Sequence, residues 1–155
     1  MYNHEPDDYS CPLCGLIAGV ETEKNKKQDI VFQNDIATTS IAPKWWANNP
    51  GSALVMPNKH IENIYDTPDD VIGELYKAVK KISIAMRNTY GCDGISTRQH
   101  NEPSGDQDVW HLHIHFFPRY KNDKLYLNHK KNGYVEAKER LVYAKKLRAY
   151  LEAQR

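Results

Sequence analysis

Three histidines alternate with apolar residues late in the chain, in the stretch VWHLHIHFFPR (109–119), which holds three of the seven histidines within five positions. Strict alternation predicts a β-strand over 109–117, because successive side chains of a strand point to opposite faces. His111, His113 and His115 would then share one face, and the apolar residues between them would line the other. A row of imidazoles backed by an apolar row indicates a site built on a core strand.

A single metal ion cannot bind all three imidazoles. A strand rises about 3.4 Å per residue, so residues two apart lie about 7 Å from each other and the outer pair about 13 Å. Metal–nitrogen bonds of about 2.0–2.1 Å can bridge the first separation but not the second. The three histidines therefore need different roles.

The middle histidine, His113, could act as a nucleophile. The unperturbed pKa of imidazole, about 6.5, leaves the neutral ring available at pH 7. On phosphorus, a ring nitrogen can form a covalent intermediate that water later cleaves. The flanking histidines could donate hydrogen bonds, one of them to the phosphoryl oxygens or the leaving group. The structural alternative is a half-exposed strand that carries histidines without a chemical role.

A second set of chemically capable residues lies near the N-terminus, where Cys11 and Cys14 are separated by two residues. This spacing lets both sulfurs bind one tetrahedral zinc ion, but it supplies only half of the ligands, and histidine is the commonest choice for the rest. A redox role requires a preceding strand, whereas only the polar tail 1–10 precedes Cys11. Two reduced cysteines without a metal remain the structural alternative. Cys92 has no partner in the sequence and is predicted to be buried, and three further histidines are expected at the surface or in support of the ligands: His4, His100 and His129.

The elements that must position these residues follow from hydrophobic periodicity. Thr67-Pro68-Asp69-Asp70 predicts the start of a long helix, because a threonine cap, an early proline and first-turn acids favour helix N-termini, and Gly91 would end it. A second amphipathic helix is predicted at the C-terminus, over 134–153. Short apolar or alternating runs predict five strands, over 29–33, 36–41, 52–56, 95–100 and 109–117. This order indicates one α+β domain, 1–155, with an antiparallel sheet.

The segments between the strands are predicted to be loops. The charged run 21–29 has no apolar period and is expected to be solvated. The run 42–51 is punctuated by Pro and Gly and carries Trp45 and Trp46.

Bulk composition excludes several classes of function. The formal net charge of +1, with scattered basic residues, does not favour a nucleic-acid or anionic-membrane partner. No apolar run approaches the roughly 18 residues that cross a bilayer. The N-terminus is acidic and polar, unlike a secretory signal. Three cysteines favour a reducing compartment over a disulfide framework, so a cytoplasmic protein is expected.

The stretch HLHIHFF (111–117) resembles the His-φ-His-φ-His-φ-φ signature of the histidine triad superfamily of nucleotide hydrolases and transferases. Two further segments extend the resemblance. The run from Gln107 to His111 looks like the Gln-x-Val-x-His lead into the triad strand, and LVMPNKH (54–60) is similar to the family's Leu-Val-Ile-Pro-Lys-x-His segment. The resemblance covers roughly 11–120 and implies an antiparallel sheet of about five strands with a long helix packed against it.

The resemblance also implies a role for each polar residue of the triad region. His113 would attack the α-phosphorus, and His115 would contact the phosphate and the leaving group. Asn101 and Gln107 would hold phosphate oxygens through neutral hydrogen bonds, which orient an anion without trapping it. Histidine rather than glutamine at 115 points to the hydrolase branches. The expected ligand is a purine nucleotide or a nucleotide conjugate.

Several bacterial triad proteins resemble this chain in having an N-terminal C-x-x-C, and their zinc is completed by two histidines. Carried over, the ligand set is Cys11, Cys14, His60 and His111. Four protein ligands leave no open coordination position, so the resemblance implies one structural zinc per chain. The family usually pairs, which implies a homodimer.

The chain departs from the family pattern at three places, each of which concerns the substrate. Thr38-Thr39-Ser40 stands where many members have Phe-x-Asp, whose Asp holds the ribose. The loop with Trp45 and Trp46 is about four residues longer than usual, and the tryptophans could stack on the base or pack structurally. Asp108 replaces the usual Ser or Thr, and a carboxylate there could aid proton transfer or repel phosphate-rich substrates.

Three functions remain open beside each other. The first is hydrolysis of nucleoside phosphoramidates or related conjugates at the α-phosphate through a nucleotidyl intermediate on His113. The second is dinucleoside polyphosphate hydrolysis. The third is a non-catalytic role, either as a nucleotide-binding sensor or partner module or as a zinc-stabilised interaction domain.

Overall fold

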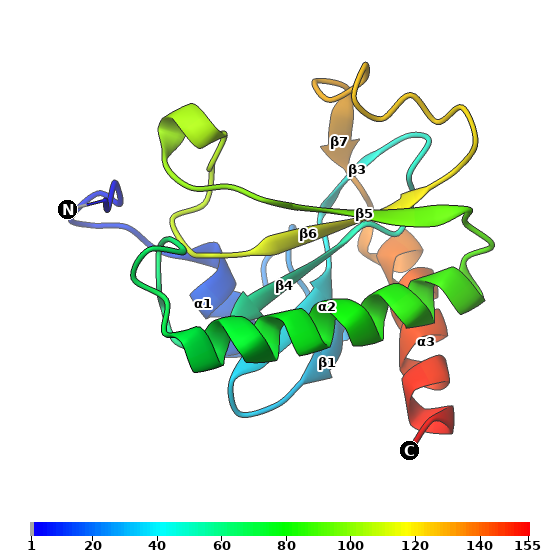
Figure 1. The fold of residues 1–155 in the computed structure, drawn as a ribbon, viewed down its shortest axis with the longest axis horizontal. Helices are drawn as coiled ribbons and strands as arrows, with labels where there is room; N and C mark the ends of the chain where they lie inside the picture. The colour runs from blue at the N-terminus through cyan, green and yellow to red at the C-terminus, as the bar shows by residue number, and fades with distance from the viewer. Residues whose placement is uncertain (1) are drawn as a thin grey trace.

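A five-stranded sheet forms the centre of the molecule in this computed structural model, which describes residues 2–155 (Figure 1). Its spatial order is β1-β2-β4-β6-β5, and every neighbouring pair is antiparallel. The α+β class and the five antiparallel strands predicted from the sequence are therefore confirmed. The bounds of the five strands are β1 Ile30–Gln33, β2 Ala37–Ile41, β4 Ala53–Pro57, β5 Gly94–Gln99 and β6 Ile114–Arg119.

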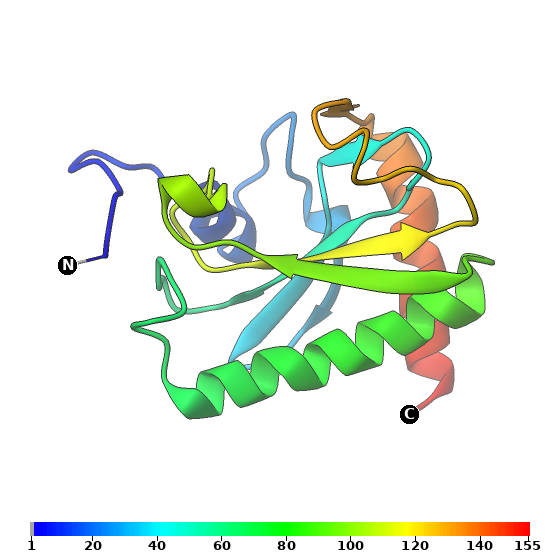
Figure 2. The ribbon, with the colours of Figure 1, turned by 45° about the horizontal axis from the view of Figure 1, so that its top comes forward.

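Helix α2, Asp69–Thr89, crosses one face of this sheet (Figures 1 and 2). Two aspartates in its first turn favour the positive end of the helix dipole, as predicted. Its apolar side chains recur at helical spacing and are buried against the sheet: Leu75, Ala78, Ile82, Ala85 and Met86. Gly91 follows the helix at φ 68°, a conformation that favours glycine. The predicted helix is correct to within two residues at each end.

The C-terminal helix, α3, covers Ala137–Ala153, so the predicted start at 134 is wrong. Residues 132–134 instead form strand β7, Asn132–Tyr134, which pairs with β3, Lys44–Trp46. The sequence analysis placed these tryptophans in a loop, and this pairing corrects that prediction too. The pairing is long-range and both strands have three residues, so local periodicity could not reveal them.

Two other segments differ from the predictions. The charged run before β1 contains a 3₁₀ helix, Lys27–Asp29, and Asp29 is buried in an ion pair with the buried Arg140 of α3 (2.9 Å). β6 begins at Ile114 rather than at 109, because the backbone before it bonds outside the ladder. The N–H of Leu112 donates to the carbonyl of Ile61 (2.7 Å). His111 and His113 therefore lie in an irregular segment that leads into the strand.

The N-terminal part of the chain packs beside this segment. Helix α1, Pro12–Ile17, buries Leu13 and Leu16. A further 3₁₀ turn, Pro103–Gly105, lies in the polar connection between β5 and β6. Within residues 2–155, none of the helices has the length and apolar character needed to span a membrane.

Candidate functional site

His113 is fixed by the backbone two residues before it. Its Nδ1 lies 2.7 Å from the carbonyl oxygen of His111 and must carry the proton, because a carbonyl can only accept. The Nε2 atom is then left with its lone pair. The ring is 5% exposed, and burial lowers its pKa. His113 is thus a neutral imidazole with an unprotonated Nε2, which is the form a nucleophile or base requires.

His115 lies next to His113 and belongs to β6. Their ring centroids are 4.8 Å apart, and His115 stacks on Phe117 at 5.6 Å with an interplanar angle of 12°. Burial lowers the pKa of His115 well below 6.5, and the positive charge of the nearby Arg98 lowers it further. The pair is therefore uncharged at neutral pH and can donate or accept hydrogen bonds without forming an ion pair with a phosphate.

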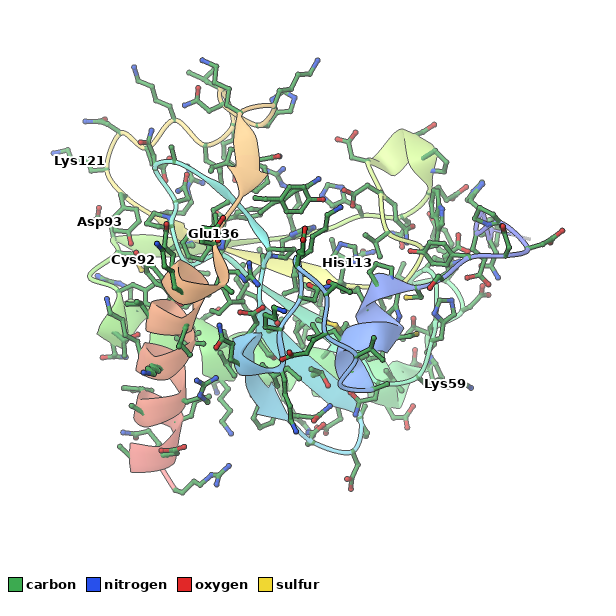
Figure 3. All side chains as sticks on the ribbon, turned by 180° about the vertical axis from the view of Figure 1, so that it is seen from behind. Lys59, Cys92, Asp93, His113, Lys121 and Glu136 are labelled. Atoms are coloured by element: carbon green, nitrogen blue, oxygen red, sulfur yellow. The ribbon has the colours of Figure 1, made fainter. Side chains whose placement is uncertain are left out.

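Both rings line a cavity of about 280 Å³. Figure 3 shows the labelled His113 from the side of the molecule opposite α2. The walls of the cavity come from α1, the loop after it, β3, β4, β6 and β7. Of the two tryptophans, Trp46 lines this cavity, whereas Trp45 is buried and donates its Nε1–H to the carbonyl of Ala42 (2.8 Å). The lining includes both apolar and polar side chains, among them Leu13, Asn25, Ala42, Leu54, Asp108, Val109 and Asn132.

Asn101 and Gln107 are placed differently from the two histidines. The Oδ1 atom of Asn101 accepts the N–H of Ile64 (2.9 Å). Gln107 is buried and donates to the carbonyl of Glu62 (2.7 Å) while accepting the N–H of Glu102 (2.8 Å). Neither residue lines the cavity. Their amides hold together the loops beside it, and a direct contact with phosphate stays a prediction.

The four predicted metal ligands come together in one cluster. It includes His111, which lies in the same segment before β6 as His113. The ligand atoms of Cys11, Cys14, His60 and His111 all lie within 4.8 Å of one another. The Sγ of Cys14 is 3.2 Å from Nδ1 of His60 and 3.5 Å from Nδ1 of His111, which is 3.3 Å from the Sγ of Cys11. A tetrahedral zinc with bonds of about 2.3 Å to sulfur and 2.0–2.1 Å to nitrogen sets sulfur and nitrogen about 3.5 Å apart. The donor set and its spacing fit one such ion.

Hydrogen bonds on the far side of each ring orient the two histidines of this cluster. The Nε2 of His111 donates to the carbonyl of Pro57 (2.9 Å). The Nε2 of His60 lies 2.8 Å from a carboxylate oxygen of Glu5. Each interaction leaves the Nδ1 lone pair directed at the thiols, which is the arrangement that metal-bound histidines adopt. In the absence of a cation, burial raises the pKa of Cys14 to about 12 and lowers that of His111 to about 4, so the charged thiolate form requires a cation nearby.

Sequence reasoning missed several residues that shape the two regions. Glu5 was part of a polar tail, yet its backbone N–H also donates to the carboxylate of Glu62 (3.2 Å), so the tail is docked. Lys24, Lys44 and Tyr134 line the histidine cavity. Since they are brought there by the β3–β7 pairing and by an irregular loop, no periodic signal could have identified them.

Comparison with known families gives a match to the HIT domain model over residues 23–122. The chain is 32% identical to the Protein hit of Bacillus subtilis over 111 residues, which is 72% of either chain. It is 30% identical to Adenylylsulfatase HINT3 of Arabidopsis thaliana over 76 residues, which cover 49% of this chain and 39% of that protein.

Solved structures give the same result for the fold. A Hit-like protein from Bartonella henselae matches with a TM-score of 0.78 and 27% identity, over 94% of this chain and 98% of that one. A zinc-bound histidine triad family protein from Mycobacterium smegmatis matches with a TM-score of 0.75 and 21% identity, over the same shares. The second likeness concerns the fold alone.

Proposed function

The chain belongs to the histidine triad (HIT) family, whose members include nucleotide-binding proteins and hydrolases. We propose that it hydrolyses nucleotide conjugates through a covalent intermediate on His113. The observation that carries the proposal is the fixed ring of His113, which keeps an unprotonated Nε2 and lines a cavity beside a second neutral imidazole. The substrate class is nucleoside phosphoramidates or related conjugates of a nucleoside monophosphate.

The reaction has two balanced steps. In the first, Nε2 of His113 attacks the α-phosphorus, and the bond from phosphorus to the leaving amine or oxygen breaks as the leaving group gains a proton from the solvent. In the second, water attacks the same phosphorus, the bond from phosphorus to Nε2 breaks, and the nucleoside monophosphate and the neutral ring are released. The proton that this water loses returns to the solvent. His115 would donate its ring N–H to the phosphoryl oxygens or the leaving group.

Neutral partners suit this chemistry. Burial keeps His113 and His115 uncharged, so His113 keeps its nucleophilic lone pair at pH 7. Nε2 of Gln107 donates to the carbonyls of Glu62 and Val109, so a contact of Gln107 with phosphate would require the exchange of one of these bonds. Nδ2 of Asn101 donates to the Oε1 of Gln99 (3.3 Å), and its second N–H could donate to phosphate. In this structure the two residues support the loops around the cavity.

We also propose that Cys11, Cys14, His60 and His111 bind one structural zinc ion. The ion would supply charge to hold two thiolates and cross-link α1 to the segments after β4 and before β6. Two thiolates and two imidazoles are the donor set that favours zinc, and the Mycobacterium smegmatis protein with the same fold is described as zinc-bound. Homodimer formation and a cytoplasmic location remain predictions of the sequence analysis.

The decisive experiment is turnover of adenosine 5′-phosphoromorpholidate, followed as released AMP. Wild type should release AMP, and His113→Ala should lose the activity. His129→Ala is the matched control, because His129 is exposed and does not line the cavity. An alkaline quench should trap a protein adduct of one nucleotidyl group in wild type and none in His113→Ala. Equal release by the wild type and His113→Ala would refute the proposal.

A further inference from the structure

Two lysines and a tyrosine share the cavity with the two histidines. Lys24 comes from the loop between α1 and the 3₁₀ helix 27–29, Lys44 from β3 and Tyr134 from β7. Lys44 and Tyr134 are direct partners across the β3–β7 pair, so their side chains emerge on the same face. In Figure 2 the loop that carries Lys24 rises beside β7. Three segments far apart in the sequence thus place these side chains in one part of the cavity wall.

Both ammonium groups lie against the same aromatic ring. The Nζ atoms of Lys24 and Lys44 are 4.7 and 5.0 Å from the ring centroid of Tyr134. Within residues 2–155, neither lysine has a carboxylate within 4.0 Å. Two like charges held near one ring repel each other, and an anion bound by both would replace that repulsion with attraction.

The other residues of the cavity do not neutralise the two positive charges of Lys24 and Lys44. His113 and His115 are uncharged because burial lowers their pKa values. Asp108 is the carboxylate in the lining, and its charge acts on His113. The two ammonium groups, that of Lys24 first, lower the pKa of the Tyr134 phenol, so both cations act on this ring. The cavity therefore has a histidine part and a cationic part.

We propose that Lys24, Lys44 and Tyr134 form an anion subsite for a second phosphate-like group of the substrate, beyond the phosphorus that His113 attacks. This inference rests on the proposed function, because it takes the His113 cavity as the substrate site. Within the proposed substrate class, it predicts a preference for nucleotides with a second anionic group. That group belongs either to the leaving group, as in a polyphosphate chain, or to the ribose.

The test compares three substrates on matched variants. Adenosine 5′-phosphoromorpholidate has a neutral leaving group, diadenosine triphosphate has an anionic one, and the 3′-phosphorylated morpholidate carries its second anion on the ribose. The double variant Lys24→Gln/Lys44→Gln removes both charges. Lys145→Gln, an exposed lysine of α3, is the control.

The double variant should lower kcat/KM at least tenfold for one of the two doubly anionic substrates, because hydrogen bonds to charged groups are stronger than neutral ones. It should change kcat/KM for the plain morpholidate less than threefold. The affected substrate identifies the position of the second anion. The ratio of kcat/KM for the affected substrate to kcat/KM for the plain morpholidate should fall with added salt in wild type, because salt screens exposed charges. The same ratio should not change with salt in the double variant. An equal effect on all three substrates overturns the inference.

A binding measurement separates this inference from the proposed function. Calorimetric titration with AMP, ATP and adenosine 3′,5′-bisphosphate gives two affinity ratios that need no turnover. Wild type should bind ATP or the bisphosphate more tightly than AMP, and the double variant should lose most of that difference. If wild type releases no AMP but shows a charge-dependent ratio, the proposed function fails and the subsite stands. If both ratios are the same in wild type and the double variant, the subsite is refuted whatever the turnover.

Discussion

His111 and His113 are two residues apart in the segment before β6, yet one belongs to the cysteine–histidine cluster and the other to the histidine cavity. Each ring has one nitrogen held by a backbone carbonyl, but not the same nitrogen. His111 donates from Nε2 to Pro57, which leaves Nδ1 for the thiols of Cys11 and Cys14. His113 donates from Nδ1 to the carbonyl of His111, which leaves Nε2. The acceptor that each ring meets thus selects which nitrogen is free.

The surroundings then determine what the free nitrogen can do. In the cysteine–histidine cluster it faces sulfur donors at 3.3 and 3.5 Å, a spacing suited to a shared cation. The ring of His113 instead lines the histidine cavity, whose volume is about 280 Å³, and lies beside His115. Identical side chains can therefore serve a structural and a chemical role once the backbone has fixed their tautomers.

Removing each ring in turn tests whether His111 serves metal binding and His113 serves catalysis. His113→Ala should lower kcat for the morpholidate by on the order of 10³–10⁶-fold, as for other lost nucleophiles, and should keep its zinc. His111→Ala should lose zinc, because the cluster keeps only three ligands. Turnover and metal content by mass spectrometry measure both effects.

His129→Ala, with both zinc and activity at the wild-type level, is the reference for these two variants. A His113→Ala protein that lost its zinc would show that the two regions are not separate. So would a His111→Ala protein that kept its zinc and lost only turnover.

Zinc should stabilise the fold through the cysteine–histidine cluster. A ligand at a thousandfold its Kd raises the free energy of unfolding by about 4 kcal/mol. Wild type in zinc should gain about this much over the chelated protein in urea unfolding, and Cys14→Ser should gain almost none. Cys92→Ser removes a buried thiol outside the cluster and should keep the zinc-dependent gain. An unchanged gain in Cys14→Ser would exclude this cluster as the zinc site.

Much of the fold could be predicted because its signals are local. The apolar spacing of α2 and the alternation in the strands report on burial within one element, and both predictions are confirmed. The cluster of Cys11, Cys14, His60 and His111 could be proposed because a resemblance supplied the two histidines that spacing alone left open. The structure brings these four side chains together.

The features that the sequence did not predict depend on contacts between segments far apart in the chain. Alternation predicted that His111 and His113 share a face, but the backbone there bonds to Ile61 rather than to a sheet ladder, and the rings serve different regions. Tyr134 was assigned to a helix because its neighbours are amphipathic, whereas pairing with Lys44 holds it in β7. Glu5 lies in a polar tail whose docking no periodic pattern reports.

Glu5 provides a finer test of the cysteine–histidine cluster. Its carboxylate accepts from Nε2 of His60, an outer contact that raises ligand basicity and whose loss typically costs 10–100-fold in metal affinity. Glu5→Gln should therefore weaken zinc binding by roughly that factor and leave kcat for the morpholidate at saturating zinc unchanged. Competition with a chromophoric chelator measures the affinity. Asp7→Asn, an exposed acid on the same tail, is the control, and equal affinities of the two variants would refute this role.

The smallest expected effect concerns the histidine cavity and low pH. Burial lowers the pKa of His115 well below 6.5 in the folded protein, while the unfolded chain has the ordinary value of about 6.5. The unfolded state therefore binds more protons below pH 6.5, and the free energy of unfolding decreases as the pH falls. The stabilisation from this residue is fully present above pH 6.5 and is lost below it, by at most about 1.4 kcal/mol per pH unit.

His115→Gln removes this titration and keeps a polar side chain. Between pH 7 and pH 5.5, wild type should lose about 1 kcal/mol more of its unfolding free energy than the variant does. Protons also compete for the cysteine–histidine cluster, but that loss is common to both proteins, so their difference isolates His115. Urea unfolding at the two pH values measures it, with His129→Gln as the exposed control. If wild type and His115→Gln lost stability in parallel, the ring in the cavity would not be held neutral by burial, and the contrast between the two regions would rest on His111 and His113 alone.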